Sequence, residues 1–286
     1  MELSYYPGCS LESSAREYDD SIRRICDALD ITLREIPDWN CCGASSAHSI
    51  NPRLAVDLAA RNLVIASRIG LPVLSPCAAC FARLKIAHKE VIAHPDSHGD
   101  IPVDPNLSII HLNELLTQPA VLQKIKQKRK RSLDALKIAP YYGCLTMRPP
   151  LLLDAENHEA PVSMDAVLDA LGVQVIDWSY KTDCCGGMHG LTRPDLVRKL
   201  SGRLYEEAED AGADALVTDC PMCQANLDTR QREIEQELSR RFAMPVFYIS
   251  ELVALALGLP DVSRWWRRHL VSPDATLARL APSDHR

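Results

Sequence analysis

The sequence lacks several features that mark common classes of protein. It has no basic excess, because 32 lysines and arginines stand against 38 acidic residues and give a formal net charge of −6. Proteins that bind nucleic acid over a wide surface usually carry such an excess, so we expect no nucleic-acid partner. The first ten residues, MELSYYPGCS, contain no basic segment followed by an apolar run. We therefore expect no secretory signal.

Long apolar segments and two familiar redox motifs are also missing. No uninterrupted apolar run reaches the roughly 18 residues that a membrane-spanning helix needs, so we expect no membrane span. The chain has neither a CxxCxxCxxxC run of the ferredoxin type nor a flavin-binding fingerprint. Any electrons that this protein uses must therefore be exchanged with other subunits.

Cysteine, by contrast, is abundant and regularly spaced, with 11 in the 286 residues. A vicinal pair is followed after 34 residues by a CxxC, and this arrangement occurs once in each half of the chain. One further cysteine leads each copy, 31 residues before the first pair and 39 before the second. The first set comprises Cys9, Cys41, Cys42, Cys77 and Cys80; the second set comprises Cys144, Cys184, Cys185, Cys220 and Cys223. The remaining Cys26 lies at a helical apolar position and is predicted to be a core residue.

Five thiols in a set exceed what a structural zinc requires, which is four ligands that usually come from two separated pairs. Adjacent cysteines cannot easily chelate one small tetrahedral ion, because their side chains diverge. They suit an extended iron–sulfur cluster, whose sulfurs could accept N–H bonds from backbone that approaches at Gly43, Gly186 and Gly187. A zinc-binding structural module and a set of buried thiols remain alternatives. Many cysteines without a secretory signal indicate the reducing cytoplasm.

The fold class predicted is α/β, with two pseudo-symmetric domains that each hold a mostly parallel sheet flanked by helices. Short strands are expected at residues 2–6, 31–36, 72–75 and around 108, and again at 137–142, 173–178, 215–219 and 246–249. Helical patterns alternate with them, which is typical of parallel sheets covered on both faces. Each cysteine group follows a strand, and open α/β sheets bind ligands at the carboxyl ends of their strands. The domains expected are 1–120 and 137–260.

Two further segments are assigned on composition. Residues 121–136 are predicted to form a basic connector helix, which is either a solvated surface or a docking patch for an acidic electron-transfer partner. Residues 261–286 are predicted to be a C-terminal tail. Its paired Trp265 and Trp266 either cover the core or form a subunit contact.

The pattern of a lone cysteine, CCG and CxxC, present twice, resembles the CCG-domain (cysteine-rich domain) family. It is most similar there to the B-type subunits of heterodisulfide reductase and of bacterial heterodisulfide reductase-like complexes. The resemblance covers nearly the whole chain, through YYPGC (5–9), YYGC (141–144), CCGG (184–187), CPMC (220–223) and SELVALALG (250–258). It implies two non-cubane [4Fe–4S] clusters, each bound by the five cysteines of one set, with the substrate disulfide between them.

The resemblance also implies a function and partners. The activity would be that of an oxidoreductase acting on sulfur groups, with a disulfide, a thiol or lipoyl-carrier-bound sulfur as substrate. Its electrons would pass through a C-type ferredoxin-like subunit and an A-type flavoprotein subunit. The alternative is an electron-transfer-only subunit, like the CCG-containing subunits of some hydroxyacid or succinate oxidoreductases. Those chains often fuse a ferredoxin module, which is absent here.

Two histidines occupy comparable positions after the vicinal pairs. His48 follows Cys42 by six residues and His189 follows Cys185 by four. Imidazole has a suitable pKa for donating the protons that disulfide reduction consumes, so both are candidate catalytic residues. The alternative is that each only hydrogen-bonds a cluster sulfur or the backbone. Near the second set, Lys181, Tyr142 and Arg148 are weaker candidates for holding an anionic substrate.

Overall fold

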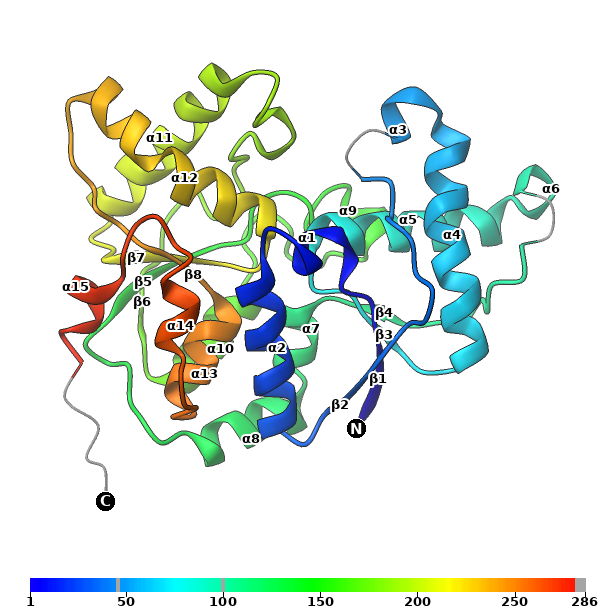
Figure 1. Cartoon of the computed structure of the whole chain (residues 1–286), viewed down its shortest axis with the longest axis horizontal. Coiled ribbons are helices and arrows are strands. Elements are labelled where there is room, and N and C mark those ends of the chain that lie inside the picture. Colours follow the sequence, from blue (N-terminus) through cyan, green and yellow to red (C-terminus); the bar gives the residue numbers. More distant parts are fainter. Residues whose placement is uncertain (45–46, 99–100, 281–286) are drawn as a thin grey trace.

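The structure is a computed structural model that describes residues 1–44, 47–98 and 101–280, with the exception of the His48 side chain. It consists of two parallel four-stranded sheets, each flanked by helices (Figure 1). The first sheet has the order β2-β1-β3-β4 and the second has the order β6-β5-β7-β8. The two halves therefore repeat one topology, and the predicted α/β fold class is confirmed.

The first half contains strands β1 (Glu2–Tyr5), β2 (Thr32–Glu35), β3 (Val73–Leu74) and β4 (Ile109–Ile110). Its helices are α1 (Gly8–Glu12), α2 (Arg16–Ala28), α3 (Ala47–Ile50), α4 (Pro52–Ile69), α5 (Ala78–Ala93), α6 (Pro95–His98) and α7 (Leu112–Leu116). Local chemistry sets their ends. The Asn51 side chain accepts the first free N–H groups of α4, Pro52 opens that helix, and left-handed Gly70 closes it.

The second half contains β5 (Lys137–Tyr141), β6 (Gln174–Val175), β7 (Ala215–Thr218) and β8 (Val246–Tyr248). Its helices are α9 (Pro150–Leu153), α10 (Ser163–Leu171), the 3₁₀ turn Gly187–His189, α11 (Pro194–Asp210), α12 (Pro221–Leu238) and α13 (Ile249–Ala256). Each half contains a capping box at a corresponding helix. His111 pairs with Glu114 at α7, and Tyr248 pairs with Glu251 at α13.

The basic segment between the halves is helical over only part of its predicted length. Helix α8 (Pro119–Lys128) ends where Arg129 becomes extended, so the helix predicted over 121–136 is wrong beyond Lys128. The reason is a contact distant in sequence, because the backbone N–H groups of Lys130 and Arg131 donate to the Ala256 carbonyl at the end of α13. Lys124 and Lys128 both bind Asp30, so part of the positive charge holds α8 to the first half.

The tail after residue 260 packs on the body through α14 (Ser263–Trp266), and α15 (Asp274–Leu277) follows it. The Trp265 side chain is buried and donates its N–H to Asp20 over 2.6 Å. Trp266 meets the Phe247 ring edge-on, with 6.3 Å between ring centroids. Both tryptophans thus contact the body of the protein, which agrees with the core-covering alternative.

The two halves meet through helices that lie side by side at the centre of Figure 1, where α2 packs against α13. The buried Tyr18 ring of α2 stacks on Tyr248, with centroids 4.2 Å apart and 11° between the planes. The Tyr18 hydroxyl donates to the Asp219 carbonyl over 3.0 Å and approaches the Pro76 carbonyl at 3.4 Å. These carbonyls belong to the residues that precede Cys220 and Cys77, so one side chain ties together the two CxxC loops.

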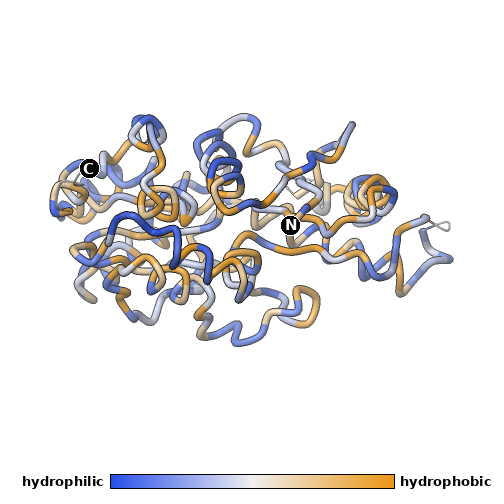
Figure 2. Tube along the Cα trace, turned by 90° about the horizontal axis from the view of Figure 1, so that it is seen from below, coloured by the Kyte–Doolittle hydropathy of each residue, from blue (hydrophilic) through white to orange (hydrophobic). Residues whose placement is uncertain are grey.

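Hydrophobic and hydrophilic residues alternate along the helices of both halves (Figure 2). None of the helices in the described ranges combines the length and the apolar composition that crossing a bilayer requires.

The interface predicts distinct effects for two Tyr18 substitutions. Tyr18→Ala should lower the free energy of unfolding by about 3–5 kcal/mol, because it empties a fully buried aromatic site. Tyr18→Phe keeps the ring stacked and removes only the hydroxyl, so it should cost about 1–3 kcal/mol. Urea unfolding followed by circular dichroism measures both. A Tyr18→Ala variant that unfolds at the wild-type urea concentration would contradict this account of the interface.

Candidate metal centres

Each vicinal cysteine loop is tied to a strand end by a buried tyrosine. The Tyr6 hydroxyl donates to the Asn40 carbonyl and the Tyr141 hydroxyl donates to the Asp183 carbonyl, both over 2.7 Å. Each tyrosine stands three residues before its leading cysteine, and each carbonyl belongs to the residue just before a vicinal pair. Sequence reasoning missed these two residues. The matching aromatic positions in YYPGC and YYGC were the available signal.

Glycine lets each leading cysteine approach its CxxC. Gly8 and Gly143 have φ values of +69° and +64°, in the left-handed region that favours glycine. A Cβ atom on Gly8 would lie 2.7 Å from Cys80 Sγ, and one on Gly143 would lie 3.0 Å from Cys223 Sγ. The same close approach in both halves brings the start and the end of each cysteine set together.

The thiols of each set lie near one another in space. Sulfur–sulfur distances are 3.2 Å for Cys42 and Cys80 and 3.6 Å for their counterparts Cys185 and Cys223. A third pair, Cys144 and Cys184, is 4.0 Å apart. The glycine after each vicinal pair donates its N–H to the first sulfur of the pair, over 3.4 Å from Gly43 to Cys41 and 3.3 Å from Gly186 to Cys184. The hydrogen bond from Cys144 lowers the pKa of Cys184 most, and burial opposes it. The backbone N–H groups of Gly186 and then Gly187 lower this pKa further.

Hydrogen bonding between neighbouring thiols lowers the pKa of one member of a pair and raises that of the other. Bonds from Cys41 and then Cys80 lower the pKa of Cys42 to about 3. The Cys144 thiol has the largest effect on Cys184, whose pKa falls to about 6, and the charge of His189 contributes least. The pKa values of Cys41 and Cys144 rise, because each is the group that retains a shared proton. Since the thiolate is the form that binds metal, both sets suit metal coordination.

Exposure differs within each set. Cys9, Cys41 and Cys184 are exposed and Cys144 is half-buried, whereas the other members of the sets are buried. Among the described residues, no three His, Cys, Asp or Glu side chains are arranged to hold a single metal ion. The thiols instead gather as neighbouring pairs, which join the vicinal pair to the CxxC in each half and Cys144 to Cys184 in the second. Such a donor set fits an iron–sulfur cluster better than a single ion. Cys26 is buried in the core as predicted, and burial raises its pKa to about 12.

Comparison with known proteins agrees with this repeated arrangement. The model of the cysteine-rich domain named CCG matches residues 3–85 and again residues 138–228. This chain belongs to the CCG cysteine-rich domain family. Each match contains one complete cysteine set and the first three strands of one sheet, so the CCG repeat follows the sheet repeat.

Relatives of the chain include components of different redox complexes. It is 34% identical over 264 residues to the 8-methylmenaquinol:fumarate reductase membrane anchor subunit of Wolinella succinogenes, covering 91% of this chain and 93% of that one. It is 26% identical over 273 residues to the B component of a CoB-CoM heterodisulfide reductase of Methanosarcina acetivorans, covering 91% of each. A hypothetical protein from Helicobacter pylori shares the fold with a TM-score of 0.75 at 11% identity, covering 95% of this chain and 52% of that one. The shared chemistry is that of an iron–sulfur redox subunit.

The predicted catalytic histidines lie on the loops that follow the CCG glycines. His189 is exposed at the end of its 3₁₀ turn, and its charge acts on Cys184. His48 lies in α3, and its side chain is outside the part of the structure that is described. The other three candidates hold carboxylates: Lys181 and Tyr142 bind Asp165, and Arg148 binds Glu159.

A different histidine lies between the two CxxC motifs. His111 is buried, and its Nε2 is 2.9 Å from the Pro76 carbonyl just before Cys77. Its Nδ1 lies 3.5 Å from Asp219 Oδ2, and Asn113 donates to the same carboxyl oxygen. Burial lowers the pKa of His111 to about 4 and raises that of Asp219 to about 8. Sequence reasoning singled out neither residue, because nothing local marks a contact between the two halves.

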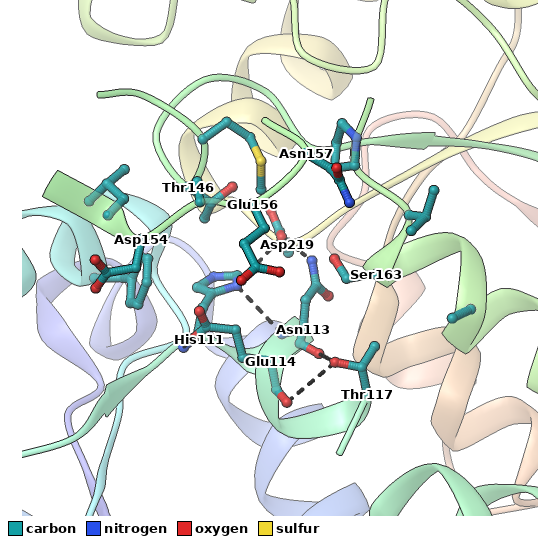
Figure 3. Close-up of a pocket in the computed structure, with 17 residues that line it drawn as sticks. His111, Asn113, Glu114, Thr117, Thr146, Asp154, Glu156, Asn157, Ser163 and Asp219 are labelled. Atoms are coloured by element: carbon teal, nitrogen blue, oxygen red, sulfur yellow. Dashed lines mark hydrogen bonds and ion pairs between the residues drawn. The ribbon is translucent and has the colours of Figure 1, made fainter. Parts of the chain in front are cut away.

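These polar groups form one wall of a cavity of about 490 Å³ between the CCG domains (Figure 3). The first half contributes Phe81 and residues 111–117, and the second contributes Asp219 and much of the segment 146–166. Phe81 follows Cys80, Thr146 stands two residues after Cys144, and Asp219 precedes Cys220. Segments of both cysteine sets therefore reach the same cavity.

Two glycines with the same backbone conformation test the thiol arrangement. Gly8→Ala should reduce the iron and sulfide bound after anaerobic reconstitution by about half, because the new Cβ displaces Cys80 Sγ in the first set only. Gly70→Ala is the matched control, since Gly70 has a φ of +70° and nothing within 4 Å of its Cβ position. Both variants pay the left-handed penalty of about 1–2 kcal/mol. Equal iron content in the two variants would contradict the assignment.

Proposed function

We propose that this chain carries out disulfide–thiol redox chemistry as the iron–sulfur subunit of an oxidoreductase complex. The observation that carries the proposal is the placement of two five-thiol sets on either side of one interface, with a cavity lined by residues that lie next to or near cysteines of both sets in the chain. A subunit that only passes electrons onward has no need of a substrate-sized cavity at this place.

The ten cysteines would hold the clusters, which we propose to be two non-cubane [4Fe–4S] clusters, one in each CCG domain. Gly43, Gly186 and Gly187 would support them through backbone N–H groups, as they already do for the thiols. When bound, the clusters supply one-electron transfer. The residues fit this role because each set offers thiols that readily lose their protons, on backbone that glycine keeps open.

The reaction is R–S–S–R′ with two electrons and two protons, giving R–SH and R′–SH. The sulfur–sulfur bond breaks, and an external one-electron donor is oxidised twice for each disulfide. We propose His48 and His189 as the proton donors, one from the segment that follows each vicinal pair. His189 is exposed and can exchange protons with solvent, while its charge acts on Cys184. In the opposite direction, the same groups would accept protons as two thiols, or a persulfide, are oxidised.

Other subunits must exchange the electrons. We propose a C-type ferredoxin-like subunit and an A-type flavoprotein subunit, because relatives of this chain are named as subunits of heterodisulfide reductases. We also propose the cytoplasm as the compartment. All 11 cysteines are free thiols in the structure, as is common in a reducing environment.

A second candidate function is electron transfer alone, within a complex that acts on fumarate or succinate. The relative from Wolinella succinogenes favours it, since that fumarate reductase subunit is 34% identical to this chain over 91% of its length. In that case the clusters would be reducible, yet no disulfide would be consumed.

A turnover assay separates the two functions. The anaerobically reconstituted chain, supplied with reduced methyl viologen and 2-hydroxyethyl disulfide, should oxidise two viologens and release two thiols per disulfide. Cys220→Ser should abolish this turnover by removing a cluster ligand. Cys26→Ala should retain it, because Cys26 lies in the core outside both sets. Clusters that are reduced and reoxidised without thiol release would overturn the disulfide function in favour of electron transfer alone.

A further inference from the structure

The two sides of the interface between the CCG domains are built differently. On one side α2 packs on α13, and the Tyr18 ring fills the space against Tyr248. On the other side α10 packs on α7, and the cavity remains there. Most of the cavity lining comes from residues 146–163, within the second leading spacer. That spacer has 39 residues against 31 in the first, so the longer of the two spacers is the one that lines the cavity.

Three buried polar atoms of the cavity wall have no hydrogen-bond partner in the described structure: Asn113 Oδ1, Thr146 Oγ1 and Asp219 Oδ1. Their residues are 4%, 6% and 0% exposed, so bulk water does not satisfy them freely. The orientation of the Asn113 amide follows from its bond to Asp219, because the NH₂ group donates there and leaves the carbonyl oxygen unused. Unpartnered buried groups of this kind are costly, and they indicate that a polar ligand or ordered water completes the site.

The charges around the cavity restrict the ligand. Among the described lining residues the acids are Glu114, Asp154, Glu156 and Asp219, and none is a lysine or an arginine. Lys85 and Lys89 bind Asp154 at the rim, and within the described ranges no lysine or arginine pairs with the other three carboxyl groups. Two cations that flank the second set in the sequence, Lys181 and Arg148, are bound to Asp165 and Glu159. A sulfonate, phosphate or carboxylate in the cavity would meet the exposed carboxylates of Glu114 and Glu156, and no lysine or arginine among the described lining residues would balance it.

We infer that the cavity binds one arm of the sulfur substrate, and that this arm carries N–H donors, as an amide or an ammonium group does, and no anionic head group. The inference rests on the proposed disulfide chemistry and specifies its substrate class. The N–H groups would donate to Asn113 Oδ1 and to the carboxylates of Glu114 and Glu156, while the Thr146 hydroxyl could donate to an amide carbonyl. The reacting sulfur would then lie toward Cys144 and Cys220, whose neighbours in the chain line the cavity.

Two disulfides with the same carbon skeleton provide the test. The reconstituted full chain, with reduced methyl viologen as donor, is given 3,3′-dithiodipropionamide or 3,3′-dithiodipropionate, and thiol release is measured. We expect kcat/KM for the diamide to exceed that for the diacid by at least about tenfold. The amide N–H groups can donate to the acceptors of the cavity, whereas the carboxylates of the diacid cannot. Glu156→Lys should lower this ratio by about tenfold, since it places a cation among the acceptors. The matched control is Asp134→Lys, the same reversal of charge at an exposed residue outside the lining, and it should shift the ratio by less than about twofold.

The outcomes separate this inference from the function on which it rests. Turnover of diamide and diacid at equal efficiency, or a preference for the diacid, would overturn the inference and leave the disulfide function intact. If the chain reduces neither compound nor 2-hydroxyethyl disulfide, the disulfide function fails. Equilibrium dialysis of the two probes against the oxidised protein then decides the cavity chemistry. Tighter binding of the diamide, lost in Glu156→Lys, would uphold it, and equal binding would overturn it.

Discussion

The Tyr18 hydroxyl bonds the two halves of the chain at the points where both CxxC loops begin. It donates to the Asp219 carbonyl and approaches that of Pro76, and its ring stacks on Tyr248 at the start of α13. The CxxC loops follow the carboxyl ends of β3 and β7, so this contact joins the two sheets at their ligand-binding edges. Because the tyrosine is wholly buried, close packing at this contact fixes how the two CxxC loops lie relative to each other.

Repetition explains why the two thiol sets have closely similar geometry. In each half a tyrosine three residues before the leading cysteine holds the vicinal pair, and a left-handed glycine lets the second CxxC sulfur approach. Each CCG glycine bonds the first sulfur of its pair. The halves differ in the segment between the leading cysteine and the vicinal pair. This segment is longer in the second half, and it supplies most of the cavity lining. Duplication thus supplies two similar thiol sets, and residues 146–163 of the second half supply most of the lining of the cavity between the domains.

The sequence alone was enough to predict features that depend on cysteine spacing and on short strand and turn patterns. Matching 34-residue spacers identified the two thiol sets, and strand–turn patterns located the two sheets. Features that depend on contacts between distant segments were not accessible. Helix α8 ends at Lys128 because the next residues bond to Ala256, and His111 matters because the second half brings Asp219 against it. A histidine in SIIHLNELL carries no local sign of such a role.

The central claim is that each half gathers five sulfurs around one inorganic core. Anomalous diffraction from anaerobically grown crystals, collected at the iron and zinc absorption edges, tests it most directly. The account predicts two separate iron-containing centres, each enclosed by the sulfurs of one cysteine set, on either side of the contact that Tyr18 makes. A zinc signal, an iron centre shared between the sets, or a centre that leaves out one of the three cysteine segments of its half would contradict it.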